Sequence, residues 1–263
     1  MTTVNDILNY LNTIAPPYMK EDWDNVGLLC GSCNQPVKKI LMALDPFEHV
    51  CREAEEIGAD LLVTHHPLIF VAPHSITDAS SVGRSILQLS RAGISAINAH
   101  TNLDCAPGGV NDVLAQRLGL NNIHVLNPRG TDANGTPWGL LRAGNVKEQP
   151  LDAFLTVVKN ALKCEGIRFV NGGRPVCNVA VGGGSCGSEL RSAYDAGCDT
   201  FVTADIKYNQ FWDATELGIN LIDAGHFHTE NPVVAVLAEK LQNTFPEIEV
   251  IQSKTHADCV KFF

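Results

Sequence analysis

Six histidines and carboxylates stand at the ends of predicted strands, where their side chains could bind metal ions. They are His65, His66, His100, Asp104, His226 and Glu230. Ligands of α/β proteins gather at the C-terminal ends of parallel strands, so these positions suit a common site. Neutral imidazoles and carboxylates are nitrogen and oxygen ligands that suit zinc, iron, manganese, nickel or cobalt without choosing among them. The set predicts a transition-metal site.

The number of these residues favours two metal ions. Six donors exceed what a single catalytic zinc ion uses. They suit two divalent ions roughly 3.5 to 4 Å apart, bridged by a carboxylate and still holding water. Such a centre stays positively charged, so it would attract an anionic substrate group, for which phosphate is the natural choice. A water of lowered pKa would attack the substrate while His100 or a neighbouring imidazole moves protons.

Each residue also has a structural interpretation. A single histidine at a strand end is more often a structural residue than a ligand, and any exposed helix can carry a histidine four residues before a glutamate. The run His65–Pro67 is more specific, because Pro67 lacks a backbone donor and ends the strand. His228 is a rival ligand close to Glu230, although its offset from His226 places it on another helical face. The remaining histidines have no such setting: His49, His74, His124 and His256.

Three further segments carry weaker signals. Asp205 and Lys207 follow the predicted strand that mirrors the one before His65, which favours an outer-shell or substrate-binding role about as much as a surface ion pair. Gly182–Gly184 could present N–H groups to a phosphate, but the lysine of a phosphate-binding loop is missing and a tight turn is the better interpretation. Trp23 is interpreted as a buried side chain rather than as a wall of the site.

Apolar periodicity predicts that strands and helices alternate along the chain, which indicates an α/β fold. In the first half we predict strands at 39–45, 59–66 and 94–100 and helices at 3–14, 46–57, 81–92 and 109–118. In the second half we predict strands at 138–143, 167–170, 178–181, 200–204, 219–224 and 248–252 and helices at 151–162, 188–196, 208–217 and after Pro232. Residues 121–136 are rich in asparagine, glycine and proline, which is typical of a connection. We therefore predict domains at 1–126 and 127–263.

The two halves contain similar segments. Residues 58–66 are similar in type to residues 197–205, and residues 93–99 are similar to residues 218–224. A histidine follows the second segment of each pair within two residues, and a carboxylate stands four residues after that histidine. This repetition indicates two similar α/β domains that face each other across a metal-containing cleft.

Composition narrows the class of protein. The formal net charge of -10 argues against an extended nucleic-acid or membrane surface. No apolar run reaches the roughly 18 to 20 residues that cross a bilayer, and the first residues lack the basic start of a signal peptide. The nine cysteines are odd in number and scattered, which suggests free thiols in a reducing compartment. We therefore expect a cytoplasmic protein.

Five segments carry a resemblance to a known family: residues 23–28 (WDNVGL), 64–70 (THHPLIF), 100–104 (HTNLD), 203–208 (TADIKY) and 225–230 (GHFHTE). In type and order they resemble the NGG-interacting-factor-three-like family, whose bacterial members are commonly labelled GTP cyclohydrolase 1 type 2 homologs. The resemblance covers nearly the whole chain. It implies a two-domain α/β subunit with a dinuclear metal centre between the domains, commonly assembled as a ring-shaped homohexamer.

Carried over by position, the resemblance implies a set of metal ligands with His100 beside them. These ligands are His65, His66, Asp104, His226 and Glu230. They would hold two divalent transition-metal ions, with zinc, iron, manganese and nickel all open. Asp205 is a departure, because many relatives are expected to have a glutamate there, and the shorter side chain would reach less far.

Two functions of different classes follow. The first is a dinuclear metal-dependent hydrolase of a phosphate-bearing heterocycle, with GTP ring opening and formate release as the specific form that the family label suggests. Its partner would be a small anionic substrate such as a nucleotide. The second is a non-catalytic metal-binding or metal-handling protein with a regulatory or scaffolding role. Loss of turnover on mutating His100, with metal retained, would favour the enzyme.

Overall fold

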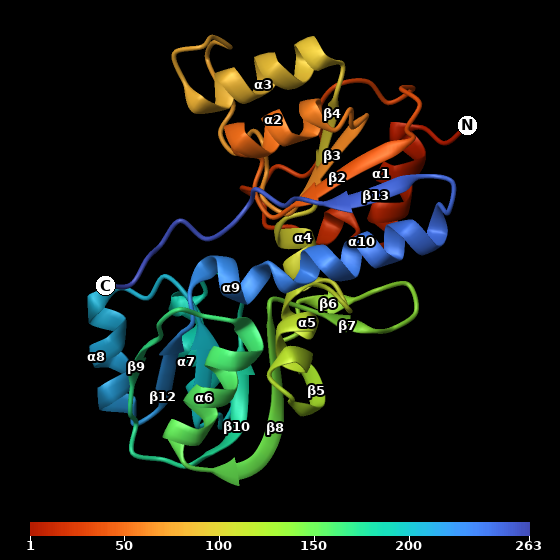
Figure 1. Cartoon of the computed structure of the whole chain (residues 1–263). Helices are drawn as coiled ribbons and strands as arrows, with labels where there is room; N and C mark the ends of the chain where they lie inside the picture. The colour runs from red at the N-terminus through yellow and green to blue at the C-terminus, as the bar shows by residue number, and fades with distance from the viewer. The chain divides into compact units, whose positions relative to one another are not determined.

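The computed structural model describes residues 1–263 and divides into two compact units. Unit 1 comprises Met1–Leu103 and Val234–Ala257, and unit 2 comprises Asp104–Val233 and Asp258–Phe263. Each unit is built on one mixed β-sheet, and strands and helices alternate along the chain (Figure 1). The predicted α/β class is confirmed.

The sheet of unit 1 has the strand order β1-β4-β3-β2-β13. Its strands are β1 (Gly27–Cys30), β2 (Lys39–Ala43), β3 (Leu61–Thr64), β4 (Ser95–Asn98) and β13 (Glu249–Gln252). β13, β2, β3 and β4 run parallel, and β1 is an antiparallel edge strand. Every residue of β3 and β4 is buried, as is typical of parallel strands that are covered on both faces.

The helices of unit 1 cover this sheet. They are α1 (Val4–Ile14), η1 (Pro17–Met19), α2 (Glu48–Glu56), α3 (Ser81–Ala92) and most of α10 (Pro232–Thr244). α2 and α3 lie together against the sheet (Figure 1), where Val50 and Leu89 pack with Leu62 in one apolar core. Tyr10 of α1 contacts the edge of Phe245, just after α10, with ring centroids 5.6 Å apart. This packing fixes the strand ends that carry the histidines.

The sheet of unit 2 has the strand order β5-β8-β10-β11-β12-β9. Its strands are β5 (Asn121–Leu126), β8 (Leu141–Gln149), β9 (Arg168–Val170), β10 (Val176–Val181), β11 (Thr200–Thr203) and β12 (Asn220–Asp223), beside a hairpin of β6 (Gly130–Thr131) and β7 (Pro137–Trp138). β10, β11 and β12 run parallel, whereas β8 and β9 run antiparallel to their neighbours.

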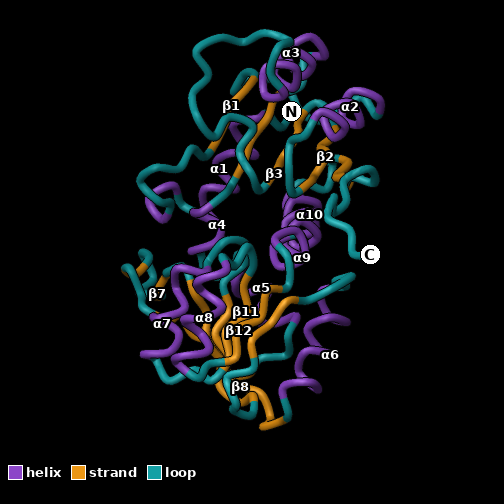
Figure 2. Tube along the Cα trace, turned by 90° about the vertical axis from the view of Figure 1, so that its left-hand side faces the viewer, coloured by secondary structure: helices purple, strands orange, loops and turns teal.

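Helices cover both faces of this second sheet. They are α5 (Val110–Arg117), α6 (Leu151–Leu162), η2 (Gly187–Glu189), α7 (Leu190–Asp195), α8 (Tyr208–Leu217) and α9 (His226–Glu230). α6 lies on one side of the strands and α7 and α8 on the other (Figure 2). Accordingly, Phe154 of α6 packs with Val179 and Val202, while Ala193 of α7 packs with Phe201. The short helix α4 (Thr101–Cys105) contains the point where the chain passes from unit 1 to unit 2.

The similarity of the two halves is visible in their topology. β2, β3 and β4 are joined by α2 and α3, and β10, β11 and β12 are joined by η2 with α7 and by α8. Gly93 and Gly218, each just before the last strand of its set, have φ angles of 69° and 66°. Only glycine adopts this left-handed conformation without steric cost, so the two helices end in the same way.

The predicted connection at 121–136 is wrong over its first part. Residues 121–126 form β5, which pairs antiparallel with β8. Its first five residues are exposed or half-buried, so they lack the apolar signal of a core strand, and tertiary pairing with β8 overrides their composition. The compact units also divide the chain elsewhere than at 126/127, because α5 and β5 pack in unit 2 and β13 returns to pair with β2.

No helix in the structure combines the length and the apolar character needed to span a bilayer.

Candidate metal centre

Three histidines of unit 1 gather where two adjacent parallel strands end. His65 and His66 directly follow β3, and His100 stands two residues after β4. The two strands pair in register at their ends, with Thr64 opposite Asn98. One ring nitrogen from each histidine lies within 4.8 Å of the other two. The predicted concentration of imidazoles at this edge of the sheet is therefore present.

Each of these three rings is held through its Nδ1 atom. His65 Nδ1 lies 2.8 Å from the carbonyl oxygen of Ala99, His66 Nδ1 lies 2.6 Å from Asp45 Oδ1, and His100 Nδ1 lies 2.8 Å from Asp24 Oδ1. A proton on Nδ1 satisfies each contact and leaves the lone pair on Nε2, which is how histidines that bind metals are oriented. The rings are therefore arranged to bind metal through Nε2.

Asp24 and Asp45 are functional candidates that the sequence reasoning missed. Burial opposes the ionisation of both, but hydrogen bonds outweigh it and hold the pKa of each well below its usual range. His100 and Thr101 supply these bonds to Asp24, and His256 and His66 supply them to Asp45. Asp45 lies at the end of a predicted strand and Asp24 within a family motif, so both positions carried a usable signal.

His256 has a setting that the sequence did not reveal. Its Nε2 atom lies 2.8 Å from Asp45 Oδ2, so it shares this carboxylate with His66. His256 therefore contacts the carboxylate that orients a candidate ligand, although its position in the sequence indicates no such role. The contact is made by a segment far from Asp45 in sequence, which no local pattern could have indicated.

The prediction that Trp23 is buried is also wrong. The neighbouring Asp24 takes the inward position, and 61% of the Trp23 surface is exposed. The Trp23 ring lies 5.7 Å from the ring of Phe70 and 6.2 Å from that of His100, between centroids. Phe70 is likewise 6.2 Å from His100. The alternative interpretation of Trp23, as a wall of the site, is the one that the geometry supports.

Unit 2 contains candidate donors of its own, an imidazole and carboxylates. His226 and Glu230 stand one turn apart on α9, with His226 Nε2 3.0 Å from Glu230 Oε2. A carboxylate oxygen of Asp104 lies within 4.8 Å of one of Glu230. Asp104 and Glu230 are buried, with exposed fractions of 7% and 4%. Carboxylate oxygens are common ligands of divalent metal ions, so this pair also suits a metal ion.

Asp205 orients His226 in the manner of Asp45 and Asp24. Its Oδ2 atom lies 2.7 Å from His226 Nδ1, and this contact lowers the pKa of Asp205. Burial opposes a charge on His226, but Asp205 and Glu230 outweigh it and raise the pKa of His226 to about 11. The metal-free ring therefore carries a proton between two carboxylates, in a position where a metal ion would replace it.

The triple glycine makes room for Glu230. A Cβ atom at Gly184, whose φ is +62°, would lie 2.1 Å from Glu230 Oε1. The N–H groups of Gly183 and Gly184 donate to Asn111 Oδ1 at 2.6 Å and to Thr229 Oγ1 at 3.0 Å. Both N–H groups therefore already donate to oxygen atoms of the protein, which supports a tight turn over a phosphate-binding loop.

His228 and Lys207 have contacts outside the candidate ligand set. His228 Nδ1 faces the carbonyl oxygen of Leu162 at 3.2 Å, and its Nε2 lies 3.2 Å from Asp258. These contacts disfavour it as a rival ligand. The backbone N–H of Lys207 donates to Gln210 Oε1 at 2.8 Å, at the start of α8, and its side chain is exposed.

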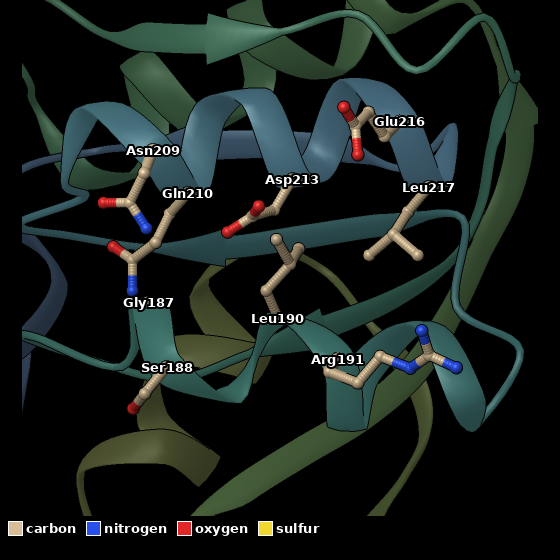
Figure 3. Close-up of a pocket in the computed structure, with 9 residues that line it drawn as sticks. All are labelled: Gly187, Ser188, Leu190, Arg191, Asn209, Gln210, Asp213, Glu216 and Leu217. Carbon is tan, nitrogen blue, oxygen red and sulfur yellow. The ribbon is translucent and has the colours of Figure 1, made fainter.

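A cavity of about 550 Å³ lies between η2–α7 and α8 (Figure 3). Asp213 and Glu216 line one side of it and Arg191 the other. None of the six candidate ligands lines this cavity. Size alone therefore does not mark it as the site of the predicted chemistry.

The fold and the donor atoms define a class: an α/β protein with histidines and carboxylates able to bind divalent transition metals. The model of the Duf34/NIF3 (NGG1p interacting factor 3) family matches residues 2–259. The chain belongs to this family, as its sequence motifs predicted.

Named relatives and solved structures agree with this assignment. A Clostridium perfringens protein named GTP cyclohydrolase 1 type 2 homolog is 36% identical over 262 residues, which cover 98% of this chain and 99% of that protein. A crystal structure of a Staphylococcus aureus hypothetical protein matches with a TM-score of 0.92 at 31% identity, covering 99% of each chain. A Bacillus cereus protein described as related to NIF3 matches with a TM-score of 0.91 at 26% identity, covering 100% of this chain and 99% of that one.

Proposed function

We propose that this protein is a metal-dependent hydrolase of a phosphate-bearing heterocycle, with GTP as the first substrate to test. The observation that carries the proposal is the set of Nδ1 contacts, which directs His65, His66 and His226 to bind metal through Nε2 and leaves Nε2 of His100 as a base. The name of the Clostridium perfringens relative supports GTP as the choice of substrate.

We further propose that this protein holds two divalent transition-metal ions. The ligands would be His65, His66, Asp104, His226 and Glu230. Three nitrogen and two carboxylate donors leave the choice among zinc, iron, manganese and nickel open. When bound, such ions lower the pKa of water so that hydroxide is available near neutral pH.

His100 would move protons in this reaction. Asp24 holds a proton on the Nδ1 atom of His100, so its Nε2 atom is the basic one. The rings of Trp23 and Phe70 lie beside His100 and limit access of water to it. A group placed in this way can accept a proton from an attacking water and return it to a leaving nitrogen.

For GTP, the proposed reaction consists of two hydrolytic steps. One water adds across the C8–N9 bond of the purine, which breaks that bond and leaves a formamide on the opened ring. A second water cleaves the formamide and releases formate. Both steps need a base to take a proton from water and an acid to protonate nitrogen, which is the role proposed for His100.

The experiment compares His100→Gln with the wild-type protein after purification without added metal or chelator. Metal content is measured by elemental analysis, and turnover is measured by formate release from GTP. We expect metal to be retained and turnover to fall by roughly 10²- to 10⁴-fold, the usual range for loss of a general acid or base. Wild-type protein that holds metal but turns over neither GTP nor related heterocycles would support the metal-handling alternative.

The family resemblance also supports a homohexamer. Sedimentation measurements on the purified chain test the assembly. A mass six times that of the 28.4 kDa chain is the expected result. A stable monomer that retains metal would contradict the proposed assembly without affecting the proposed chemistry.

A further inference from the structure

A smaller cavity of unit 2, of about 300 Å³, opens beside the candidate ligand His226. It is lined by glycines, two phenylalanines, a valine and a set of charged side chains that includes Arg168, Asp205, Asp223 and Asp258. This volume is at the lower end of the range for small-molecule sites, which are mostly apolar with a few placed polar groups. The cavity is therefore large enough for part of a substrate.

The segment Asp258–Phe263 forms one wall of this cavity. Val260 and Phe262 line it, and contacts on both sides hold the segment in place. Asp258 Oδ2 lies 3.2 Å from His228 Nε2, and Lys261 Nζ lies 3.3 Å from Glu165 Oε1. Phe227 also lines the cavity, so it has apolar side chains from two segments that are distant in sequence.

Gly166 allows Phe262 to lie in this position. A Cβ atom at residue 166 would lie 2.5 Å from both Cδ1 and Cε1 of the Phe262 ring. The ring therefore rests directly against the backbone of Gly166, and any larger residue at 166 would push it away. About half of the Phe262 surface is still exposed, so the ring offers an apolar face to a ligand.

Arg168 provides a cationic group in the same cavity. It pairs with the buried Asp223, and its Nη2 atom lies 3.4 Å from the carbonyl oxygen of Ile206. The guanidinium has five N–H donors in a fixed plane, and 59% of the side chain is exposed. It is therefore able to donate to an oxygen atom of a ligand as well as to Asp223.

We propose that this cavity binds the planar heterocyclic ring of the substrate. Phe262 provides the face on which the ring stacks, and Arg168 donates to an oxygen of the same ligand. Because the cavity adjoins His226, a bound ring lies next to the proposed metal ligands. The inference rests on the proposed function for the identity of the ligand as a nucleotide.

The test measures binding of guanosine 5′-monophosphate and of ribose 5-phosphate by calorimetry, using metal-loaded full-length protein. Phe262→Ala is compared with Phe263→Ala, because Phe263 is fully exposed and does not line the cavity. We expect Phe262→Ala to weaken nucleotide binding by about two- to twelvefold, the usual effect of losing one aromatic contact. Phe263→Ala should leave it unchanged, and neither variant should alter binding of ribose 5-phosphate.

Gly166→Ala provides an independent variant that keeps the Phe262 ring but moves it. We expect it to weaken nucleotide binding as Phe262→Ala does, while circular dichroism confirms that both variants are folded. Equal nucleotide affinities of Phe262→Ala and Phe263→Ala would overturn the inference. It would also be overturned if Phe262→Ala lost affinity for the nucleotide and for ribose 5-phosphate to the same extent. Failure of the wild-type protein to bind the nucleotide would overturn it too.

Turnover distinguishes this inference from the proposed function. If Phe262→Ala selectively weakens nucleotide binding but the protein does not hydrolyse GTP, the proposed role of the cavity is supported and the proposed hydrolase function is contradicted. If the wild-type protein and Phe262→Ala hydrolyse GTP with the same KM, the hydrolase function is supported and the proposal that the cavity binds the substrate ring is overturned.

Discussion

The three central parallel strands of unit 1 and those of unit 2 are built alike but end in different side chains. Asp60, before β3, accepts from the backbone N–H of Lys39 at 3.0 Å, and Asp199, before β11, accepts from that of Asn178 at 2.7 Å. Each aspartate thus ties the start of one strand to the start of the preceding one. The repeated segments of the sequence encode this shared frame.

The strand ends differ in the donors that they carry. β3 leads to His65 and His66, whereas β11 leads at the corresponding positions to Ala204 and Asp205. Asp205 has a φ of +52° and contacts His226, so it orients an imidazole instead of supplying one. Unit 1 therefore offers nitrogen donors, and unit 2 offers mainly carboxylates. The difference shows that a common frame fixes where donors lie, while substitutions at the strand ends fix their chemistry.

The largest effect should come from crowding the carboxylates of unit 2. In Gly184→Ala the added methyl group would collide with the Glu230 carboxylate, and most of the bound metal should be lost. Gly173→Ala is the matched control, because its φ of +77° is similarly strained but its Cβ meets nothing within 4 Å. Both variants should lose about 1 kcal/mol of stability, while only Gly184→Ala loses metal. Equal metal contents by elemental analysis would contradict the role given to Gly184.

The carboxylates that orient the histidines of unit 1 should have the next largest effect. Asp45→Asn weakens the contact that holds the proposed ligand His66 and should lower metal affinity by about 10- to 100-fold. Asp24→Asn acts on His100, which is proposed to move protons, so it should lower turnover and leave metal affinity unchanged. Asp22→Asn is the control, because Asp22 is an exposed neighbour in the same loop. Competition with a chromogenic chelator measures the affinities. A metal affinity unchanged in Asp45→Asn would exclude the orienting role of Asp45.

The proton on His226 makes metal binding dependent on pH. The folded-state pKa of His226 is raised from 6.5 to about 11, so its charge stabilises the metal-free protein below pH 6.5 and this stabilisation is lost as pH rises through about 11. Metal must displace this proton, so affinity should increase by about tenfold per pH unit between pH 7 and 9. Asp205→Asn removes one cause of the raised pKa of His226. In this variant, metal affinity should therefore stop increasing at a lower pH than in the wild-type protein. Identical profiles for the two proteins would contradict the assignment.

Replacing the aspartate that joins two strand starts should destabilise both units equally, and the loss of stability should not depend on bound metal. Asp60→Ala and Asp199→Ala each leave backbone N–H groups without a charged acceptor, which costs about 1.5 to 3 kcal/mol of unfolding free energy. Urea denaturation of the metal-free proteins measures this loss, and elemental analysis should find unchanged metal content. A loss confined to one variant would show that the two frames are not equivalent.

The sequence predicted most of the frame because its signals are local. α6 and α8 have the predicted limits, since apolar periodicity determines them. The central strands lie within the predicted ranges, except that β10 begins two residues before its predicted start at 178. β5 was not predicted, because its partner β8 is formed by residues further along the chain. An edge strand of exposed residues has no local signal that separates it from a loop.

The candidate donors were predictable, but the contacts that orient them were not. His65, His66 and His100 stand at strand ends, and a strand end can be recognised from the sequence. The contacts from Asp24 to His100 and from His256 to Asp45 join residues 76 and 211 positions apart. Such pairs form only when the fold brings distant segments together. Trp23 was misplaced for the same reason, because the hydrogen bonds of Asp24 decide which neighbour faces inward.

The most direct test of the metal centre is elemental analysis of protein purified without added metal or chelator. His66→Ala removes a donor of unit 1 and Glu230→Ala a donor of unit 2, with exposed His124→Ala as the control. If both residues are metal ligands, wild-type protein and His124→Ala should hold about two transition-metal ions per chain. Both ligand variants should hold fewer. Metal-free wild-type protein that cannot be loaded with zinc, iron or manganese would contradict the account.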